Sequence, residues 1–476
     1  MSALAGLAAV GGNLPTDAIK SVRKMLRAMR PEGQEAEESV ADMGPVVIGK
    51  LSCGGDAGRA ATASREAGRI ACVCDGEIYE PSPEGGSCEE PLLRRYERDG
   101  PGHFADGLNG TFAAAIADER DGSLHLVTDA VASRGLFTFV RDGVFCFASE
   151  VKGLLALDFV PAEADAVAVA SFLARNFMVL RRTLVRDVRQ VDYATVVTAG
   201  PGGVEARPYW RYRIEPDARC SRGEAREELE RRMRRAVERR TASGRVGMLL
   251  SGGLDSRGIL SCLDDPARIP AATYTGRSEA EVGEGGDLAV ARRLAETAGM
   301  PLRVFRYAAG DMLDAMADSV YAGELGAGFV FENVWDDIRE SLRADSMLAG
   351  DESFGHGVPP MAASQVLDKA GIVRLGDYPA VLACLAPNVR EELIAASDEE
   401  VRAVAAEAAS GTPFGRLDEI FFAQRAVQFV APKRRVINRH GLTVRNPWLD
   451  WELLDFVRRL PDRLRNRKRL YKAALR

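Results

Sequence analysis

Several features that mark common protein classes are missing from this chain of 476 residues. Its eight cysteines form no CxxC pair and no His/Cys cluster with zinc spacing, which indicates free thiols in a reducing compartment. No uninterrupted apolar run is long enough to span a bilayer. The apolar start, Met1 to Val10, lacks the basic residues of a signal peptide and predicts a strand. We therefore expect a cytoplasmic protein without a membrane segment.

The chain also lacks an excess of basic residues. Its 63 Lys and Arg stand against 69 Asp and Glu, and the formal net charge of -6 argues against nucleic acid as a main partner. Arginine-rich stretches such as Arg231 to Arg235 lie beside acidic residues, which is typical of a solvated helix face. The length exceeds that of one hydrophobic core, so the sequence predicts two domains.

The most informative stretch runs from Val246 to Arg257. Val246 to Leu250 is a short apolar run that predicts a buried parallel strand, followed by a glycine turn that can open a helix. Two glycines allow close approach of the backbone to a ligand, two serines offer hydroxyls, and the helix start favours an anion. No Gly-Lys-Ser/Thr follows, which excludes a Walker loop. The predicted phosphate site consists of Ser251, Gly252, Gly253, Leu254, Asp255 and Ser256, with Asp255 as a magnesium ligand.

Strands and helices alternate on either side of this loop. Apolar positions at helical spacing predict a helix over 221–241, and strand and helix patterns follow over 271–275, 287–298 and 302–307. This order predicts a doubly wound parallel sheet with its site at the carboxyl ends of the strands. The alanine-rich stretch from Pro379 to Val436 predicts a helical subdomain around the substrate end.

A second polar turn follows an apolar approach at Met347 to Ala349. Gly350, Asp351 and Glu352 place two carboxylates there, and they can complete a magnesium site with Asp255. An exposed Asx turn is the alternative. His356 is adjacent, and it is either a loop residue or a candidate base.

Residues 1 to about 205 consist of short predicted strands and two helices. This mixture indicates an α+β layered sandwich. The strands are expected over 2–10, 45–53, 69–74, 112–118, 123–128, 137–141 and 144–148, and the helices over 17–29 and 89–99.

The motifs of both halves carry a family resemblance. The string from Ser251 to Ser256 resembles the pyrophosphate loop of the ATP pyrophosphatase superfamily, whose members cleave ATP between the α and β phosphates. Asp75 to Glu80, Leu108 to Ala114 and Phe147 to Lys152 resemble the class II glutamine amidotransferase domain of asparagine synthetase B. Val444 to Phe456 resembles the Arg-x-Pro-Phe-Leu-Asp motif of the same family, and the segments 460–463 and 472–476 resemble its lysine-containing end.

This resemblance implies an N-terminal-nucleophile αββα sandwich over residues 1–205 and an ATP-pyrophosphatase domain over residues 206–476. ATP and Mg²⁺ are the implied cofactors. Lys472 would stabilise charge on the phosphate or on the tetrahedral intermediate. Asp351 matches either the metal-binding aspartate or the acidic residue that helps to activate the amine, and Glu352 would serve metal or amine. Relatives usually continue beyond the lysine, so we expect the short tail to contribute little to closing the site.

The resemblance fails at the residues that hydrolyse glutamine. The nucleophile position is Ser2 in place of cysteine, and the oxyanion-hole position is Asp75, whose charge would repel a developing oxyanion. Cys88 stands where an acidic residue would bind the amino group, and the arginine for the glutamine carboxylate is replaced near Lys50. We expect a structural domain; a serine-type amidohydrolase with Ser2 as nucleophile is the alternative.

Three functions remain open. The first is an amide-forming, AMP-releasing synthetase or cyclase of specialised metabolism, as in the β-lactam synthetases and lasso peptide cyclases, whose first domains are also inactive. The second is an asparagine synthetase or other amidotransferase that uses ammonia or glutamine, and the third is a silent nucleotide-binding scaffold. The expected partners are a small-molecule or peptide carboxylate, an amine donor and, for a cyclase, a precursor peptide with partner biosynthetic proteins.

Overall fold

The computed structural model of the chain describes residues 2–31, 33–53, 61–65, 68–80, 88–276, 286–307, 312–324, 333–350, 354–360 and 362–475. It contains two compact units. The first unit is made of Met1–Arg211, Ile372–Val404 and Ala423–Ala431, and the second of Tyr212–Gly371, Ala405–Phe422 and Pro432–Arg476.

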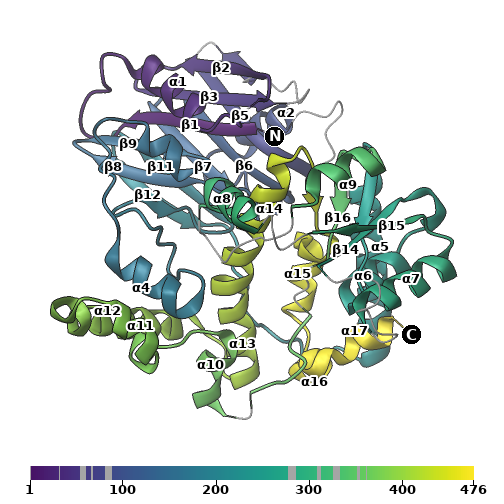
Figure 1. Cartoon of the computed structure of the whole chain (residues 1–476). Coiled ribbons are helices and arrows are strands. Elements are labelled where there is room, and N and C mark those ends of the chain that lie inside the picture. The colour runs from purple at the N-terminus through teal and green to yellow at the C-terminus, as the bar shows by residue number, and fades with distance from the viewer. Residues whose placement is uncertain are drawn as a thin grey trace. The chain divides into compact units, whose positions relative to one another are not determined.

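Two six-stranded antiparallel sheets form the centre of the first unit (Figure 1). Their strand orders are β10-β8-β9-β1-β3-β2 and β12-β11-β7-β6-β5-β4. The strands are β1 (Ser2–Ala9), β2 (Ala36–Asp42), β3 (Val46–Cys53), β4 (Ala61–Arg65), β5 (Gly68–Glu80), β6 (Asn109–Asp118), β7 (Ser123–Thr128), β8 (Phe137–Arg141), β9 (Val144–Ala148), β10 (Arg189–Gln190), β11 (Thr195–Gly200) and β12 (Gly203–Pro208).

Side-chain alternation along the strands produces four layers. In β1, Leu4 packs between the two sheets, whereas Leu7 packs on helix α1 (Ala18–Ala28), because successive side chains of a strand point to opposite faces. In β5, Val73 faces the other sheet and Cys72 faces helix α2 (Glu89–Asp99). The predicted αββα sandwich is therefore confirmed.

Three further helices of the first unit pack together. They are α4 (Ala166–Arg175), α11 (Pro379–Cys384) and most of α12 (Pro387–Glu407), and they share a small apolar cluster. The Arg175 guanidinium is fully buried and bonds Glu400 at 3.0 Å and the Ser397 hydroxyl at 2.9 Å. The alanine-rich stretch is helical as predicted, but Ile372–Val404 belongs to the first unit and not to a subdomain of the second.

Two cysteines of the first unit correct the expectation of free thiols. Cys74 of β5 and Cys88, directly before α2, form a disulfide. Cys72, two residues before Cys74 in β5, packs in the same layer against α2 but is a free, buried thiol. No spacing pattern marks the bonded pair, because the sandwich brings the two residues together from positions 14 apart in sequence.

The second unit is built on a five-stranded parallel sheet with the order β15-β14-β13-β16-β17. The strands are β13 (Val246–Leu249), β14 (Ala271–Thr275), β15 (Leu302–Arg306), β16 (Ser346–Leu348) and β17 (Thr443–Arg445). The chain winds outward from β13 to β15 and then returns to place β16 beside β13. The direction of winding therefore reverses between β13 and β16.

Helices cover both faces of this sheet. Met248 and Leu348 pack on one face with residues of α5 (Arg222–Thr241), α6 (Leu254–Ser261) and α7 (Asp287–Ala298). Ala272 and Met347 pack on the other face with Trp335 of α9 (Trp335–Leu342). This arrangement confirms the predicted doubly wound fold.

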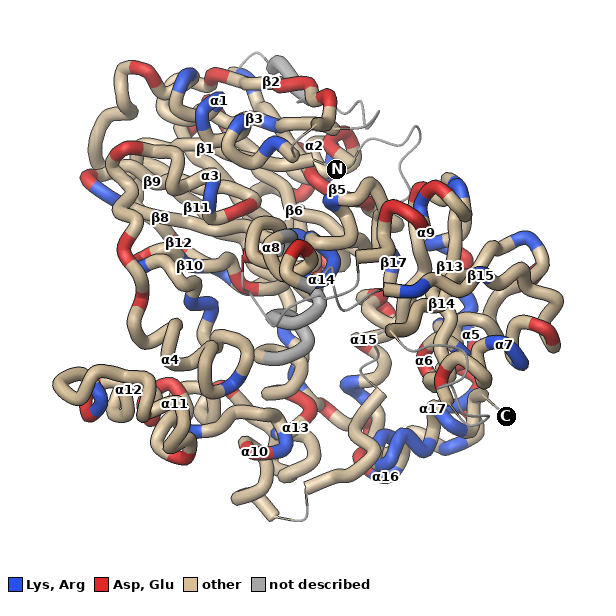
Figure 2. The backbone as a smooth tube through the Cα atoms, in the orientation of Figure 1, with Lys and Arg blue, Asp and Glu red and all other residues tan. Residues whose placement is uncertain are grey.

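The C-terminal part is helical, as predicted. A π-helix over Phe421–Ala426 follows α13 (Pro413–Ile420) and precedes α14 (Val427–Arg439). The last helices are α15 (Trp451–Val457), α16 (Asp462–Arg465) and α17 (Arg469–Ala474), and the segment through the last two is rich in Lys and Arg (Figure 2). The remaining α-helices are α3 (Val151–Leu155), α8 (Met312–Gly323) and α10 (Val366–Ala370).

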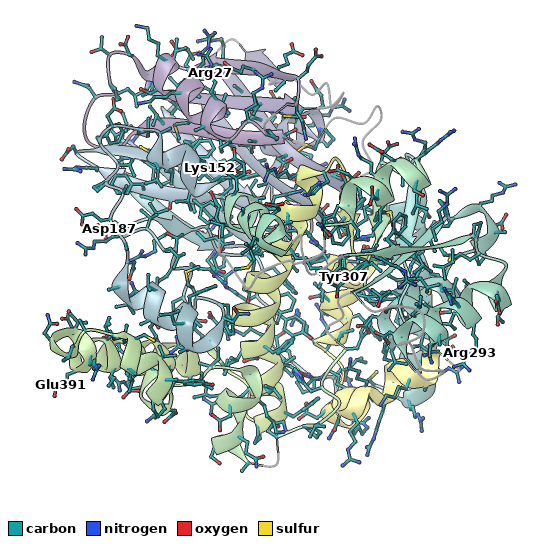
Figure 3. The ribbon with its side chains drawn as sticks, viewed as in Figure 1. Arg27, Lys152, Asp187, Arg293, Tyr307 and Glu391 are labelled. Atoms are coloured by element: carbon teal, nitrogen blue, oxygen red, sulfur yellow. A yellow bond between two sulfur atoms is a disulfide. The ribbon has the colours of Figure 1, made fainter. Side chains whose placement is uncertain are left out.

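Charged side chains cover the outer faces of the helices. Arg293 of α7 and Glu391 of α12 are both exposed (Figure 3). Within the ranges that the structure describes, no helix is both long and apolar enough to cross a membrane.

Candidate active site

The loop after β13 lies where the winding of the parallel sheet reverses. Gly350 follows β16, the strand beside β13, and it packs directly against the loop. A Cβ atom added at Gly350 would lie 2.9 Å from Cβ of Asp255 and 3.0 Å from its carbonyl carbon. The two predicted polar turns therefore meet at the carboxyl ends of neighbouring strands, the usual ligand position in such sheets. Asp351 and Glu352 lie outside the described residues.

Hydrogen bonds within the loop fix its conformation. The Ser256 hydroxyl donates to the carbonyl oxygen of Ser251 at 3.0 Å and accepts from the Ser251 amide at 3.1 Å. The Ser251 hydroxyl accepts from the Gly253 amide at 3.2 Å. Gly252 has no room for a side chain, because a Cβ there would lie 2.7 Å from Oδ1 of Asp287. Ser256 is buried and closes the turn, whereas Gly253 is exposed.

The loop leads directly into α6. Gly253 is the N-cap residue, and Asp255 lies in the first turn of this eight-residue helix. The amides at a helix start attract anions, and a glycine at the cap leaves them open to a close approach. The loop therefore has the chemistry of a phosphate cradle with a carboxylate at its side.

Three aromatic residues brace the first turn of α6. Tyr471 donates its hydroxyl to the carbonyl oxygen of Leu254 at 3.0 Å, and the Trp448 indole donates to that of Asp255 at 3.1 Å. The ring of Phe354 stacks on Tyr471 at 4.4 Å and meets Trp448 edge-on at 5.7 Å. Three motifs far apart in sequence thus converge on the loop.

Lys468 shares its electrostatic environment with Asp255 and Lys472. Burial lowers the pKa of Lys468 from its ordinary value, the Asp255 carboxylate opposes this shift, and the positive charge of Lys472 adds to it. Lys472 is exposed on α17, and Lys468 is half-buried just before that helix. Sequence reasoning selected Lys472 and missed Lys468, because Lys468 lies in a basic run that resembles a solvated tail.

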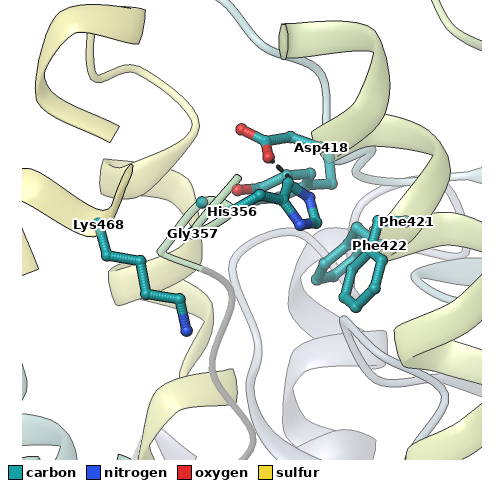
Figure 4. Close-up of a pocket in the computed structure, with 8 residues that line it drawn as sticks. His356, Gly357, Asp418, Phe421, Phe422 and Lys468 are labelled. Atoms are coloured by element: carbon teal, nitrogen blue, oxygen red, sulfur yellow. Dashed lines mark ion pairs between the residues drawn. The ribbon is translucent and has the colours of Figure 1, made fainter. Parts of the chain in front are cut away.

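Lys468 also lines a pocket of the second unit with a volume of about 190 Å³. His356 and Phe421 lie across the pocket from Lys468 (Figure 4). Among the described residues, its lining consists of Tyr212, Gly355, His356, Gly357, Asp418, Phe421, Phe422 and Lys468. Phe354, next to the lining residue Gly355, stacks on Tyr471, which bonds the carbonyl oxygen of Leu254, so the pocket lies beside the phosphate loop.

Asp418 is held from two sides at the pocket wall. Its Oδ1 lies 3.1 Å from Nε2 of His356, and its Oδ2 pairs with the buried guanidinium of Arg465. Arg465 also pairs with Asp462 at 2.5 Å. His356, a candidate base in the sequence, is thus oriented by a carboxylate that no sequence pattern indicated.

The described residues fit Mg²⁺ only in part. No group of three or more His, Cys, Asp or Glu side chains in the described part of the chain is arranged to hold a metal ion. Magnesium commonly binds through one or two carboxylates together with substrate phosphates. Asp255, beside the phosphate loop, is a suitable first carboxylate, and the second candidate, Asp351, lies outside the described residues.

The candidate glutaminase residues lie at the sandwich of the first unit. Ser2 begins β1 and is buried, and Asp75 of β5 forms an ion pair with Arg134 at 3.8 Å. Lys50 of β3 forms a buried ion pair with Glu89 at 2.8 Å, and Cys88 is in the disulfide. The cation expected to bind the glutamine carboxylate therefore already has an internal carboxylate partner.

Comparisons with known proteins find a family match for each half of the chain. The family described as glutamine amidotransferase domain matches residues 1–210. The family described as asparagine synthase matches residues 228–334 and 351–476. The chain belongs to the asparagine synthetase-like family. The asparagine synthase match covers the loop at Ser251 to Ser256 and the end at Lys472.

Individual relatives are distant and match in part. Asparagine synthetase [glutamine-hydrolyzing] 3 of Bacillus subtilis is 26% identical over 176 residues, which cover 36% of this chain and 28% of that protein. Amidase chyE of Penicillium rubens is 24% identical over 285 residues, which cover 54% of this chain and 42% of that protein. This asparagine synthetase-like chain thus spans less than half the length of either relative.

Among solved structures, the glutamine phosphoribosylpyrophosphate amidotransferase of B. subtilis, complexed with ADP and GMP, is 12% identical, with a TM-score of 0.32. The match covers 63% of this chain and 65% of that chain. An allosteric regulatory enzyme of purine biosynthesis is 13% identical, with a TM-score of 0.31 and coverage of 63% and 64%.

Proposed function

We propose that this asparagine synthetase-like protein is an ATP-dependent ligase that forms an amide bond and releases AMP and pyrophosphate. The observation that carries the proposal is the meeting of Gly350 with Asp255 of the phosphate loop at the reversal point of the parallel sheet. A phosphate cradle and a carboxylate that can hold magnesium are groups that stabilise the phosphate charge of an adenylation.

The chemistry follows in two steps. A substrate carboxylate oxygen attacks the α-phosphorus of ATP, the bond from that phosphorus to the bridging oxygen breaks, and pyrophosphate leaves. An amine then attacks the acyl carbon, the bond to AMP breaks, and the amine loses a proton. The loop at Ser251 to Ser256 would bind the leaving pyrophosphate, and Lys472 would stabilise negative charge on the acyl and phosphate oxygens. When bound through Asp255, and through Asp351 or Glu352, Mg²⁺ would neutralise phosphate charge.

The contacts within the first unit favour a source of the amine other than glutamine. Asp75 with Arg134, Lys50 with Glu89 and the disulfide at Cys88 replace the groups that would bind and hydrolyse glutamine. We therefore propose that ammonia or the substrate itself supplies the nitrogen, as in a cyclase or β-lactam-forming enzyme. A precursor peptide and partner biosynthetic proteins belong to the cyclase version of this proposal.

The second candidate function is a nucleotide-binding scaffold. It is favoured by the incomplete metal site, because no group of three or more His, Cys, Asp or Glu side chains in the described part of the chain is arranged to hold a metal ion. ATP binding without pyrophosphate release from any of a panel of carboxylates would support this scaffold over the ligase.

The decisive experiment measures pyrophosphate released from Mg-ATP in the presence of candidate carboxylates. We expect Asp255→Ala to abolish release while the circular dichroism spectrum stays unchanged. Asp264→Ala, an exposed carboxylate just after the same helix, is the matched control and should retain full activity. Undiminished release by Asp255→Ala would contradict the assignment.

A separate incubation with glutamine tests the first unit. We expect no glutamate above the uncatalysed background. Steady glutamate release that disappears in Ser2→Ala would show that the first unit is an active amidohydrolase, and it would favour the amidotransferase function.

A further inference from the structure

The pocket lined by His356, Phe421 and Lys468 is built from two unusual backbone segments. Phe421 begins the π-helix, a rare conformation that is frequent at functional sites. Arg467 and Lys468 are two successive residues with left-handed φ angles of 56°, which cost energy in residues other than glycine. Strain of this kind persists where the surrounding structure holds it, and here it directs Lys468 to the pocket.

The charges at the pocket wall favour an anion. Among the described lining residues, Lys468 and Asp418 carry a formal charge, besides the titratable His356. Both oxygens of Asp418 are already engaged, one by His356 and the other by Arg465, so this carboxylate has little attraction left for a cation. Within the described lining, the Lys468 ammonium group is therefore the positive charge available to an anionic ligand.

The remaining wall is aromatic. Tyr212 and Phe422 stack at a centroid distance of 4.3 Å, and Phe421 meets the His356 ring edge-on at 4.8 Å. Flat apolar groups pack well on such rings, and they gain more there than in water. The size of the pocket suits one group of about the size of an aromatic side chain.

We propose that this pocket binds the acyl half of the substrate, a carboxylate attached to an aromatic or similarly flat apolar group, with the carboxylate on Lys468 and the apolar group against Phe421 and Phe422. This assignment rests on the ligase function proposed above. The pocket lies beside the phosphate loop, because Phe354, next to the lining residue Gly355, stacks on Tyr471, and Tyr471 bonds the carbonyl oxygen of Leu254. Lys468 acts as a binding residue for the group that is activated.

The test uses 3-phenylpropionate as the probe. Its binding to the full chain is measured by calorimetry in the presence of Mg²⁺ and an ATP analogue with a methylene group between the α and β phosphates. We expect 3-phenylpropionate to bind, and the uncharged 3-phenylpropionamide to bind about tenfold more weakly or not at all. Lys468→Met should weaken 3-phenylpropionate binding by about tenfold or more, and Lys468→Arg should restore most of it.

Arg467→Met is the matched control, because Arg467 has the same backbone conformation and charge but is exposed and does not line the pocket. It should bind 3-phenylpropionate like the unchanged protein. Phe421→Ala should weaken 3-phenylpropionate far more than acetate, which has no ring.

The proposal is overturned if 3-phenylpropionate does not bind, if the amide binds equally well, or if Lys468→Met has no more effect than Arg467→Met. Binding of the ATP analogue, recorded in the same experiment, distinguishes failure of the pocket assignment from failure of the proposed ligase function. Suppose that analogue binding and pyrophosphate release both depend on Asp255, but that Lys468→Met binds 3-phenylpropionate like the unchanged protein. The pocket assignment would then be wrong, and the ligase function would still hold. Absence of analogue binding would remove the ligase itself.

Discussion

Tyr471 donates its phenolic hydroxyl to the carbonyl oxygen of Leu254 at 3.0 Å, which ties the last helix of the chain to the start of α6. The Tyr471 side chain is buried, and its pKa is raised by that burial and by the nearby Asp255 carboxylate. Gly258 has no side chain, and a Cβ there would collide with this hydroxyl. Lys472 follows Tyr471 directly, so the position of the proposed catalytic lysine depends on this contact.

Tyr471→Phe should therefore disturb the position of Lys472 without changing the binding of ATP. Loss of the hydrogen bond should lower the free energy of unfolding by about 1 kcal/mol, because the partly buried Leu254 carbonyl loses a donor. Pyrophosphate release should slow several-fold, with little change in the affinity for ATP, since Lys472 shifts but the loop remains. Urea unfolding and a pyrophosphate assay measure the two effects. Tyr378→Phe, at a side chain 37% exposed, is the control, and equal behaviour of the two variants would refute the positioning role.

Gly350→Ala should lower pyrophosphate release by displacing Asp255. The added methyl group would lie 2.9 Å from Cβ of Asp255, so either the helix start or the end of β16 must move. Because the Asp255 carboxylate is the proposed metal ligand, we expect pyrophosphate release to fall by about tenfold or more, a loss of more than about 1.4 kcal/mol in transition-state stabilisation.

Gly223→Ala supplies the comparison, because a Cβ at Gly223 of α5 meets nothing within 4 Å. This variant should keep full activity. Normal pyrophosphate release by Gly350→Ala would show that the turn after β16 does not constrain Asp255.

Much of the fold was predictable because burial and alternation are visible in the sequence. The bounds of α2, β7, β8 and β9 agree with the pattern, since their apolar residues face one of the packed layers. The edge strand β2, Ala36–Asp42, was missed. Its side chains are only partly buried, and backbone pairing to β3 holds it in place. The sequence of this strand therefore shows no pattern of apolar residues.

Only the part of the site that one continuous segment forms could be predicted from the sequence. The turn from Ser251 to Ser256 has its own glycine and serine pattern, and its hydrogen bonds are local. The pocket instead combines Tyr212, His356, Asp418 and Lys468 from four distant segments. Each of these residues is ordinary in its own stretch, so only the tertiary structure identifies the group.

The buried pair of Lys50 and Glu89 predicts a stability effect in the first unit. Their side chains are 3% and 1% exposed, and Glu89 also accepts a bond from the Cys74 amide at 3.2 Å. Lys50→Met should lower the free energy of unfolding by about 3 to 5 kcal/mol, because it leaves a buried carboxylate without its cation. The double variant Lys50→Met, Glu89→Gln should recover a large part of this loss, which urea unfolding measures. A loss below about 1 kcal/mol for Lys50→Met would mean that the pair is not buried in solution.

His125 predicts how the stability of the first unit changes with pH. Its imidazole lies in β7 between the hydroxyls of Ser123 at 2.9 Å and Thr198 at 3.0 Å, and burial lowers its pKa below 6.5, although Asp121 and Asp118 oppose this shift. The folded chain therefore binds fewer protons here than the unfolded chain, so this contribution to stability is full above about pH 6.5 and is lost as the pH falls below it.

From about pH 7.5 to about pH 5.5 we expect the free energy of unfolding of the unchanged protein to fall more than that of His125→Gln, by up to about 1.4 kcal/mol per pH unit. Glutamine can keep bonds to both hydroxyls but does not titrate. His103→Gln, at a side chain 76% exposed, should follow the unchanged protein. Parallel curves for His125→Gln and the unchanged protein would show that the buried imidazole is not the group responsible.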